Sequence, residues 1–161
     1  MHALGLSPLR HLAPAGPVIA RLLVGIVMAA HGWQKLTEMT PAGFGGDMLG
    51  MLGVPAPILV GWIVTIVELG GGLLLILGAL TRIAALLNAG VLVGALLLVK
   101  LDIGLLTPTG ADMPGAELEL GLLAGLLVVA LLGPGKPSLD HALGIEEGTP
   151  TTSNADSYAT S

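Results

Sequence analysis

Four long apolar segments, separated by stretches rich in Gly and Pro, constrain this chain more than any other feature of its sequence. About 20 apolar residues are needed to cross the hydrocarbon core of a bilayer. The fourth segment is the weakest span, because Glu117 and Glu119 stand in its first turn. Carboxylates are favourable at a helix N-terminus, so they do not prevent insertion. The sequence therefore predicts an all-α fold, an antiparallel four-helix transmembrane bundle with helices at about 17–38, 57–80, 82–101 and 116–132.

The composition agrees with a membrane protein. Only 11% of the residues are charged and 53% are hydrophobic, whereas soluble domains carry about 25% charged residues. We expect a cytoplasmic leader at 1–16, one membrane domain at 17–143, and a disordered tail at 144–161. A net charge of −5 with six Lys and Arg residues argues against nucleic-acid binding. The absence of cysteine excludes disulfides, cysteine-ligated zinc and iron–sulfur clusters within the chain.

Polar residues at helical spacing end the first apolar segment. They share one helical face at positions i, i+3, i+4 and i+7, namely His31, Gln34, Lys35 and Glu38. Glu68 interrupts the second segment about 11 residues after its start, near the bilayer midplane at ~16 Å along the helix. Ionisable groups in hydrocarbon are costly and usually face a protein interior. Two readings of His31 and Glu68 stay open, a proton-handling or ligand-binding pair and a structural hydrogen bond between helices. For Lys35, snorkelling to lipid headgroups is favoured.

The distribution of basic residues predicts the orientation. With four spans both termini share one side, which carries four of the six basic residues, Arg10, Arg21, Arg82 and Lys136. The positive-inside rule then places both termini in the cytoplasm. This topology brings the ends of different helices together in the outer half of the membrane. The candidate pocket residues there are His31, Gln34, Lys35, Glu68 and Glu117.

The remaining polar residues of the helices divide between the pocket and structural roles. Glu117 is preferred to Glu119 for the pocket because it shares a face with Gly121 and the two acids, at i and i+2, point to different faces. Asn88 is expected to form an interhelical hydrogen bond, and Lys100 to be structural. No metal site is predicted, since His31 has no partner at H-x-x-x-H or E-x-x-H spacing.

Several motifs of this chain, taken in order, resemble the DoxX family. They are RLLVG at 21–25, AHGWQKL at 30–36, GF at 43–44, LGVP at 52–55, ELGGG at 68–72, GALTR at 78–82, ELE at 117–119 and LGPGKPSLD at 132–140. The resemblance covers roughly residues 20–143. It implies a four-helix, multi-pass protein of the bacterial plasma (inner) membrane. The family takes its name from a membrane subunit of a thiosulfate:quinone oxidoreductase, and some members are linked to oxidative-stress assemblies. The positions that match its polar signature are His31, Gln34, Lys35, Glu68 and Glu117.

The resemblance and the polar residues together suggest an integral membrane subunit of a quinone-linked redox system, with sulfur or oxidative-stress chemistry as the candidates. The chain shows no ligand set for a cofactor of its own, so a quinone, or a soluble redox partner protein, would carry the electrons. Whether this chain is itself an enzyme stays open. The alternative is a non-catalytic scaffold that binds membrane lipid or partner proteins, including a second copy of itself. A small proton-coupled transporter ranks last, because no broken helix is evident.

Overall fold

The structure is a computed structural model that describes residues 7–101, 103–107, 109 and 115–146. Every element within these residues is helical, as predicted. The order is η1 (Ser7–Ala15), α1 (Gly16–Gln34), η2 (Lys35–Met39), α2 (Pro41–Gly43), η3 (Phe44–Leu49), α3 (Pro57–Leu77), α4 (Thr81–Ala95), η4 (Leu96–Lys100), α5 (Glu117–Leu132) and α6 (Leu139–Ala142). Of the η segments, η1 is a 3-10 helix and the other three are π-helical. The expected disordered tail falls largely outside the described residues.

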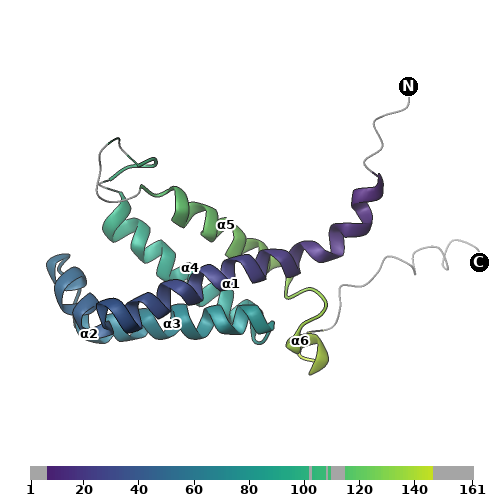
Figure 1. The fold of residues 1–161 in the computed structure, drawn as a ribbon, viewed down its shortest axis with the longest axis horizontal. Helices are drawn as coiled ribbons and strands as arrows, with labels where there is room; N and C mark the ends of the chain where they lie inside the picture. Colours follow the sequence, from purple (N-terminus) through teal and green to yellow (C-terminus); the bar gives the residue numbers. More distant parts are fainter. Residues whose placement is uncertain (1–6, 102, 108, 110–114, 147–161) are drawn as a thin grey trace, which may run out of the picture.

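The four long helices form a ring. α1 packs against α3, α3 against α4, α4 against α5, and α5 back against α1 (Figure 1). The core inside the ring is built from side chains of all four helices, including Met28, Leu75, Ala85 and Leu126. Large apolar side chains such as Leu23, on α1, point outward instead. An apolar exterior around an apolar core is the pattern of a protein surrounded by lipid.

Three continuous helical stretches are long and apolar enough to cross a membrane. They are His11–Met39, Pro57–Leu77 and Thr81–Lys100. α5 has 16 residues, which at about 1.5 Å per residue is shorter than the ~30 Å hydrocarbon core. The prediction of an all-helical fold is therefore confirmed, with three helices long and apolar enough to cross a membrane, whereas a fourth membrane-crossing helix remains a prediction.

Glycines bring α1 and α3 into backbone contact. A Cβ atom added at Gly72 would lie 2.4 Å from the backbone nitrogen of Ala29, and one added at Gly32 would lie 2.3 Å from that of Leu69. Only glycine permits such an approach, which is the small-residue packing that membrane helices use. Because the backbones touch here, side chains one turn away on the two helices can reach each other.

A short lid, which we define as Pro41–Leu49, crosses the end of the ring where α1 leaves it and α3 begins. Its Gly45 is so close to α3 that an added Cβ would lie 2.5 Å from the carbonyl oxygen of Pro57. Phe44 and Leu49 turn into the protein. Both segments of the lid, α2 and η3, are helical, whereas Met51, just beyond the lid, is exposed.

At the opposite end, the segment around α6 holds the turn between α3 and α4. Asp140 accepts hydrogen bonds from the backbone nitrogens of Leu80 (2.7 Å) and Thr81 (2.8 Å), at the start of α4. Arg21 donates from Nη1 to the carbonyl oxygens of Leu75 (2.9 Å) and Ile76 (2.8 Å), at the end of α3. Orphan backbone groups at helix ends are thus satisfied by residues far away in the sequence.

Side chains distant in the sequence complete this end of the ring. Asp140, and not Thr81, caps α4, and the Thr81 hydroxyl has no partner among the described residues. The guanidinium of Arg82 donates to the carbonyl oxygens of Ala130 and Leu131, at the end of α5, and pairs with Glu146. Ser138 caps α6, because its side chain accepts a hydrogen bond from the His141 nitrogen.

Candidate functional site

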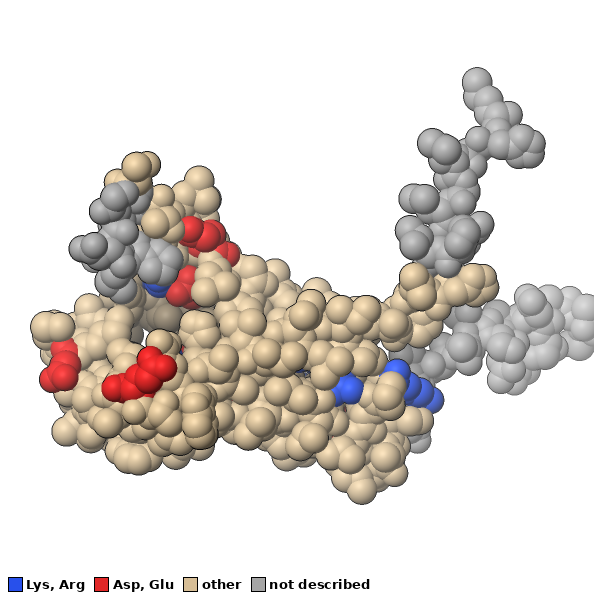
Figure 2. Space-filling model, viewed as in Figure 1, with Lys and Arg blue, Asp and Glu red and all other residues tan. Residues whose placement is uncertain are grey.

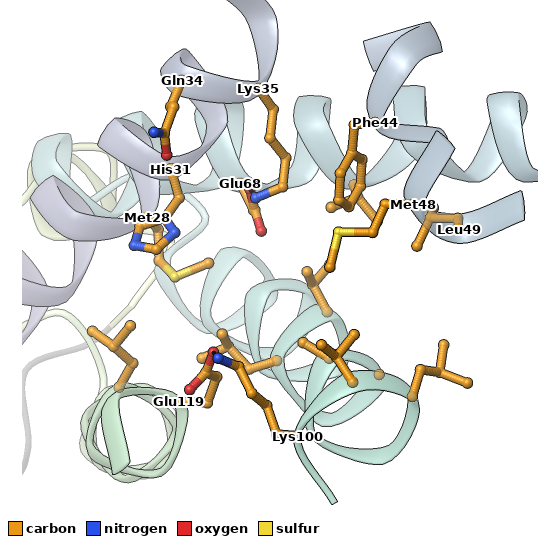
Figure 3. A pocket seen from close by; sticks show the side chains of 18 of the residues that line it. Met28, His31, Gln34, Lys35, Phe44, Met48, Leu49, Glu68, Lys100 and Glu119 are labelled. Carbon is orange, nitrogen blue, oxygen red and sulfur yellow. Dashed lines mark hydrogen bonds and ion pairs between the residues drawn. The ribbon is translucent and has the colours of Figure 1, made fainter. Parts of the chain in front are cut away.

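A cavity of about 360 Å³ lies at the lid end of the ring, between α1, α3, α4, α5 and the lid (Figure 3). All three π-helical segments contribute to its lining, with Lys35 from η2, Phe44 from η3 and Lys100 from η4 among their residues. π-helical turns widen a helix locally and change the direction of the side chains that follow, and they are frequent at functional sites. The three π-helical segments of the described chain, η2, η3 and η4, therefore all lie at the wall of this cavity.

The first polar feature of the cavity is an ion pair between η2, which continues α1, and α3. The Nζ of Lys35 lies 2.6 Å from Oε2 of Glu68, and both side chains are largely buried, at 13% and 6% exposed. The ammonium group also stands 5.2 Å from the centre of the Phe44 ring, within cation–π range. The glycine contact between α1 and α3 makes this short distance possible. Lys35 therefore turns inward and does not snorkel to headgroups.

The second polar group is an ion pair between η4 and α5. The Nζ of Lys100 lies 3.3 Å from Oε1 of Glu119, with the side chains 7% and 14% exposed. The other oxygen of Glu119, Oε2, is buried and has no hydrogen-bond partner among the described residues. Figure 3 shows this pair on the wall of the cavity that faces Lys35 and Glu68. The cavity thus has a Lys–Glu pair on each of two walls.

Glu119, rather than Glu117, lines the cavity, which corrects the choice made from the sequence. Glu117 is exposed, and its Oε1 accepts hydrogen bonds from the backbone nitrogen and the hydroxyl of Thr107. The two acids do point to different faces, as their spacing predicts. The shared face with Gly121 was a misleading signal, because Gly121 also faces outward.

His31 and Gln34 both line the cavity, at its α1 wall. The Nε2 of Gln34 donates to Oε2 of Glu38 at 3.2 Å, on the exposed side of the helix. His31 is close to Met28 in the cavity wall (Figure 3). No hydrogen bond joins His31 to Glu68 among the described side chains, because the Glu68 carboxylate is turned to Lys35.

Asn88 lies outside the cavity and is fully buried in α4. Its Nδ2 donates to the carbonyl oxygen of Ala84, 2.8 Å away in the same helix. The amide packs against Gly71 of α3, where an added Cβ would lie 2.2 Å from Nδ2. The expected interhelical hydrogen bond is therefore replaced by a bond within α4 and a close interhelical contact.

The chemistry of the cavity follows from these groups. Two positive and two negative side chains balance one another, and the remaining walls are apolar, with three methionines (Met28, Met39 and Met48) that adapt to irregular shapes. Such a site suits an uncharged, mostly apolar molecule with polar atoms at its edge. Within the described part of the chain, no group of three His, Cys, Asp or Glu residues could hold a metal ion. The sequence did not reveal the role of Glu119 or of the methionines.

The comparisons with known proteins identify the family. A family model described as DoxX matches residues 16–101. The "Uncharacterized membrane protein Rv3486" of Mycobacterium tuberculosis is 35% identical, over 81% of this chain and 82% of that protein. The "Inner membrane protein YqjF" of Escherichia coli is 31% identical, over 84% of this chain and 97% of its own length. The "Putative oxidoreductase CatD" of Bacillus subtilis is 30% identical, over 78% of this chain and 84% of that protein. No solved structure matches the chain. The protein is a membrane protein, and it belongs to the DoxX family.

Proposed function

We propose that the protein is the membrane component of a quinone-linked redox system and that its cavity holds the quinone ring. The observation that carries this proposal is the presence of two buried Lys–Glu pairs on different walls of one apolar cavity. A quinone ring is flat and apolar, with carbonyl oxygens on opposite edges that accept hydrogen bonds. Lysine ammonium groups are strong donors to such oxygens.

The size and the surroundings of the cavity also suit a quinone. A volume of about 360 Å³ falls within the ~300–1,000 Å³ range of small-molecule sites. The outer surface of the ring is apolar, so a ligand dissolved in the membrane could reach the site from the lipid. A bound quinone would supply two-electron chemistry, and the protein would position it. We assign the exchange of electrons to a partner protein, since the described residues offer no cluster that ligates a metal. One relative is named an oxidoreductase, which agrees with the proposal.

The proposal includes an orientation. Arg82 and Lys136 lie at the α6 end of the molecule, whereas the two lysines of the lid end are buried in ion pairs. In Figure 2 most of the visible Lys and Arg atoms lie at the α6 end, and the visible Asp and Glu atoms lie at the lid end. By the positive-inside rule, the α6 end and both termini would face the cytoplasm. α5 would then complete a four-helix bundle, and the cavity would lie in the outer half of the bacterial inner membrane.

Filling the cavity tests the proposal. Gly94 of α4 lines the cavity, and a Cβ added there meets no atom within 4 Å. Gly94→Leu should therefore occupy the ligand space without disturbing the backbone. Gly90, one turn earlier in the same helix, is exposed and also has open space, so Gly90→Leu is the matched control.

The measurement is native mass spectrometry of protein extracted gently from membranes that contain quinone. Wild type and Gly90→Leu should carry a quinone, and Gly94→Leu should lose at least about nine-tenths of it, which requires a loss of affinity of at least about tenfold, or ~1.4 kcal/mol. Wild type that never retains a quinone would defeat the proposal. Equal retention by Gly94→Leu would place the quinone elsewhere.

A non-catalytic scaffold is the second candidate, and outward-facing glycines favour it. Gly90 of α4 and Gly121 of α5 are exposed on neighbouring helices, and neither has an atom within 4 Å of an added Cβ. Small residues on a lipid-facing surface let another membrane helix approach closely. If Gly90→Leu lowers the recovery of a partner protein or of a homo-oligomer while Gly94→Leu does not, the scaffold function is favoured.

A further inference from the structure

The two ion pairs of the cavity differ in their nitrogen–oxygen distance and in how fully the protein satisfies the hydrogen-bonding capacity of the carboxylate. Lys35 and Glu68 are 2.6 Å apart, and the lysine is also in contact with the Phe44 ring of the lid. The partners of this pair therefore come from α3, η2 and the lid. We regard it as a bond that holds these three elements together.

The pair of Lys100 and Glu119 is looser. Its nitrogen–oxygen distance is 3.3 Å, and Oε1 is the carboxylate oxygen of Glu119 that faces the lysine. The other, Oε2 of Glu119, is buried without a donor among the described residues. A buried carboxylate oxygen normally has a hydrogen-bond partner, because leaving it without one costs free energy. Since Glu119 lines the cavity, a ligand in the cavity is positioned to supply the missing donor.

We infer that Glu119 accepts a hydroxyl hydrogen from the bound ring, so that the cavity holds a quinol in preference to the corresponding quinone. The inference rests on the proposed function and adds to it which form is bound and by which residue. An ionised carboxylate can accept hydrogen bonds but cannot donate them. A quinol hydroxyl therefore matches Glu119, whereas a quinone carbonyl would place one acceptor against another.

The expected preference is large enough to measure. Hydrogen bonds to charged groups typically change affinity by about ten- to a hundredfold. Three probes isolate the hydroxyl hydrogen, namely menadiol, its oxidised form menadione, and menadiol dimethyl ether, which has the quinol ring without the hydrogens. Affinities are measured under argon by equilibrium dialysis against the full-length protein in lipid nanodiscs, and binding to empty nanodiscs is subtracted. Wild type should bind menadiol at least about tenfold more tightly than either of the other two.

Two variants assign the preference to Glu119. Glu119→Gln replaces a pure acceptor by an amide whose nitrogen can donate to a carbonyl, so the preference for menadiol should disappear or reverse. Glu117→Gln makes the same change two residues away, on the exposed side of α5, and should keep the preference.

The outcomes separate this inference from the function on which it rests. If wild type binds all three probes equally, or if the preference survives Glu119→Gln, the inference is wrong while a quinone site remains. If wild type binds none of the probes, the proposed function and the inference fall together. The three-probe comparison on wild type needs no variant, so it decides whether the cavity prefers the quinol even if Glu119→Gln does not fold.

Discussion

Replacing Gly72 by alanine should separate α1 from α3, whereas the same change at Gly70 should not. An added Cβ at Gly72 would lie 2.4 Å from the Ala29 nitrogen and 2.8 Å from the Gly25 carbonyl oxygen. Ordinary contacts of a Cβ begin at about 3.4 Å, so the two backbones would have to move apart by about 1 Å, the difference between 3.4 and 2.4 Å. At Gly70 an added Cβ meets no atom within 4 Å.

The magnitude follows from two opposing effects. Replacing glycine by alanine within a helix is favourable by about 0.5–1 kcal/mol, and this gain is common to both variants. Overpacking a close contact costs about 1–3 kcal/mol, and only Gly72→Ala has this cost. The difference between the two variants therefore isolates the contact, and Gly72→Ala should be less stable than Gly70→Ala by about 1–3 kcal/mol.

The assay is reversible unfolding in mixed micelles, with the free energy of unfolding compared among wild type, Gly70→Ala and Gly72→Ala. Gly70→Ala should match or exceed wild type. If Gly72→Ala is as stable as Gly70→Ala, the backbones of α1 and α3 are not in contact at this glycine. The glycine-dependent placement of Lys35 beside Glu68 would then be wrong as well.

Two further predictions concern the ends of the ring and use the same unfolding assay. Asp140→Ala leaves the buried backbone nitrogens at the start of α4 without an acceptor, and it should cost about 1–3 kcal/mol for each unpaired group, with Asp140→Asn in between because one oxygen remains. Wild-type stability in Asp140→Ala would show that water or another group replaces the cap. Glu68→Leu leaves Lys35 buried and unpaired, and it should cost about 3–5 kcal/mol. The double variant Lys35→Met with Glu68→Leu should recover most of that loss, and purely additive effects would contradict a direct ion pair.

Local signals in the sequence account for most of the helices. α3 begins at Pro57, which suits a first helical turn, and ends at Leu77 before Gly78 with a φ of 69°. The apolar segments between such signals are long enough to indicate membrane helices by themselves. These features depend on neighbouring residues only, so a single sequence is sufficient to predict them.

The candidate site depends on features that are not local. The sequence placed Lys35 and Glu68 together in the outer half of the bundle, but it could not give the rotation of each helix about its axis. That rotation decides whether Glu117 or Glu119 faces inward, and π-helical turns such as η2 shift it further. The cap that Asp140 provides also could not be predicted from local sequence, since its partners lie 59 and 60 residues away along the chain.

Both ends of the ring contain backbone conformations that local rules do not predict, so strained backbone does not by itself identify the functional end. Among the described residues, three non-glycine residues have positive φ: Thr40 at 57° and Ala56 at 48°, before and after the lid, and Leu80 at 46°, at the α6 end. Such conformations cost about 1–3 kcal/mol each and persist only where surrounding contacts impose them. At the α6 end, Arg21 and Asp140 bind backbone groups at helix ends, as a purely structural role requires. At the lid end two Lys–Glu pairs instead face a cavity, and Oε2 of Glu119, which lines it, has no partner among the described residues. The difference between the two ends is therefore the presence of charged pairs around a cavity, and this difference supports placing the function at the lid end.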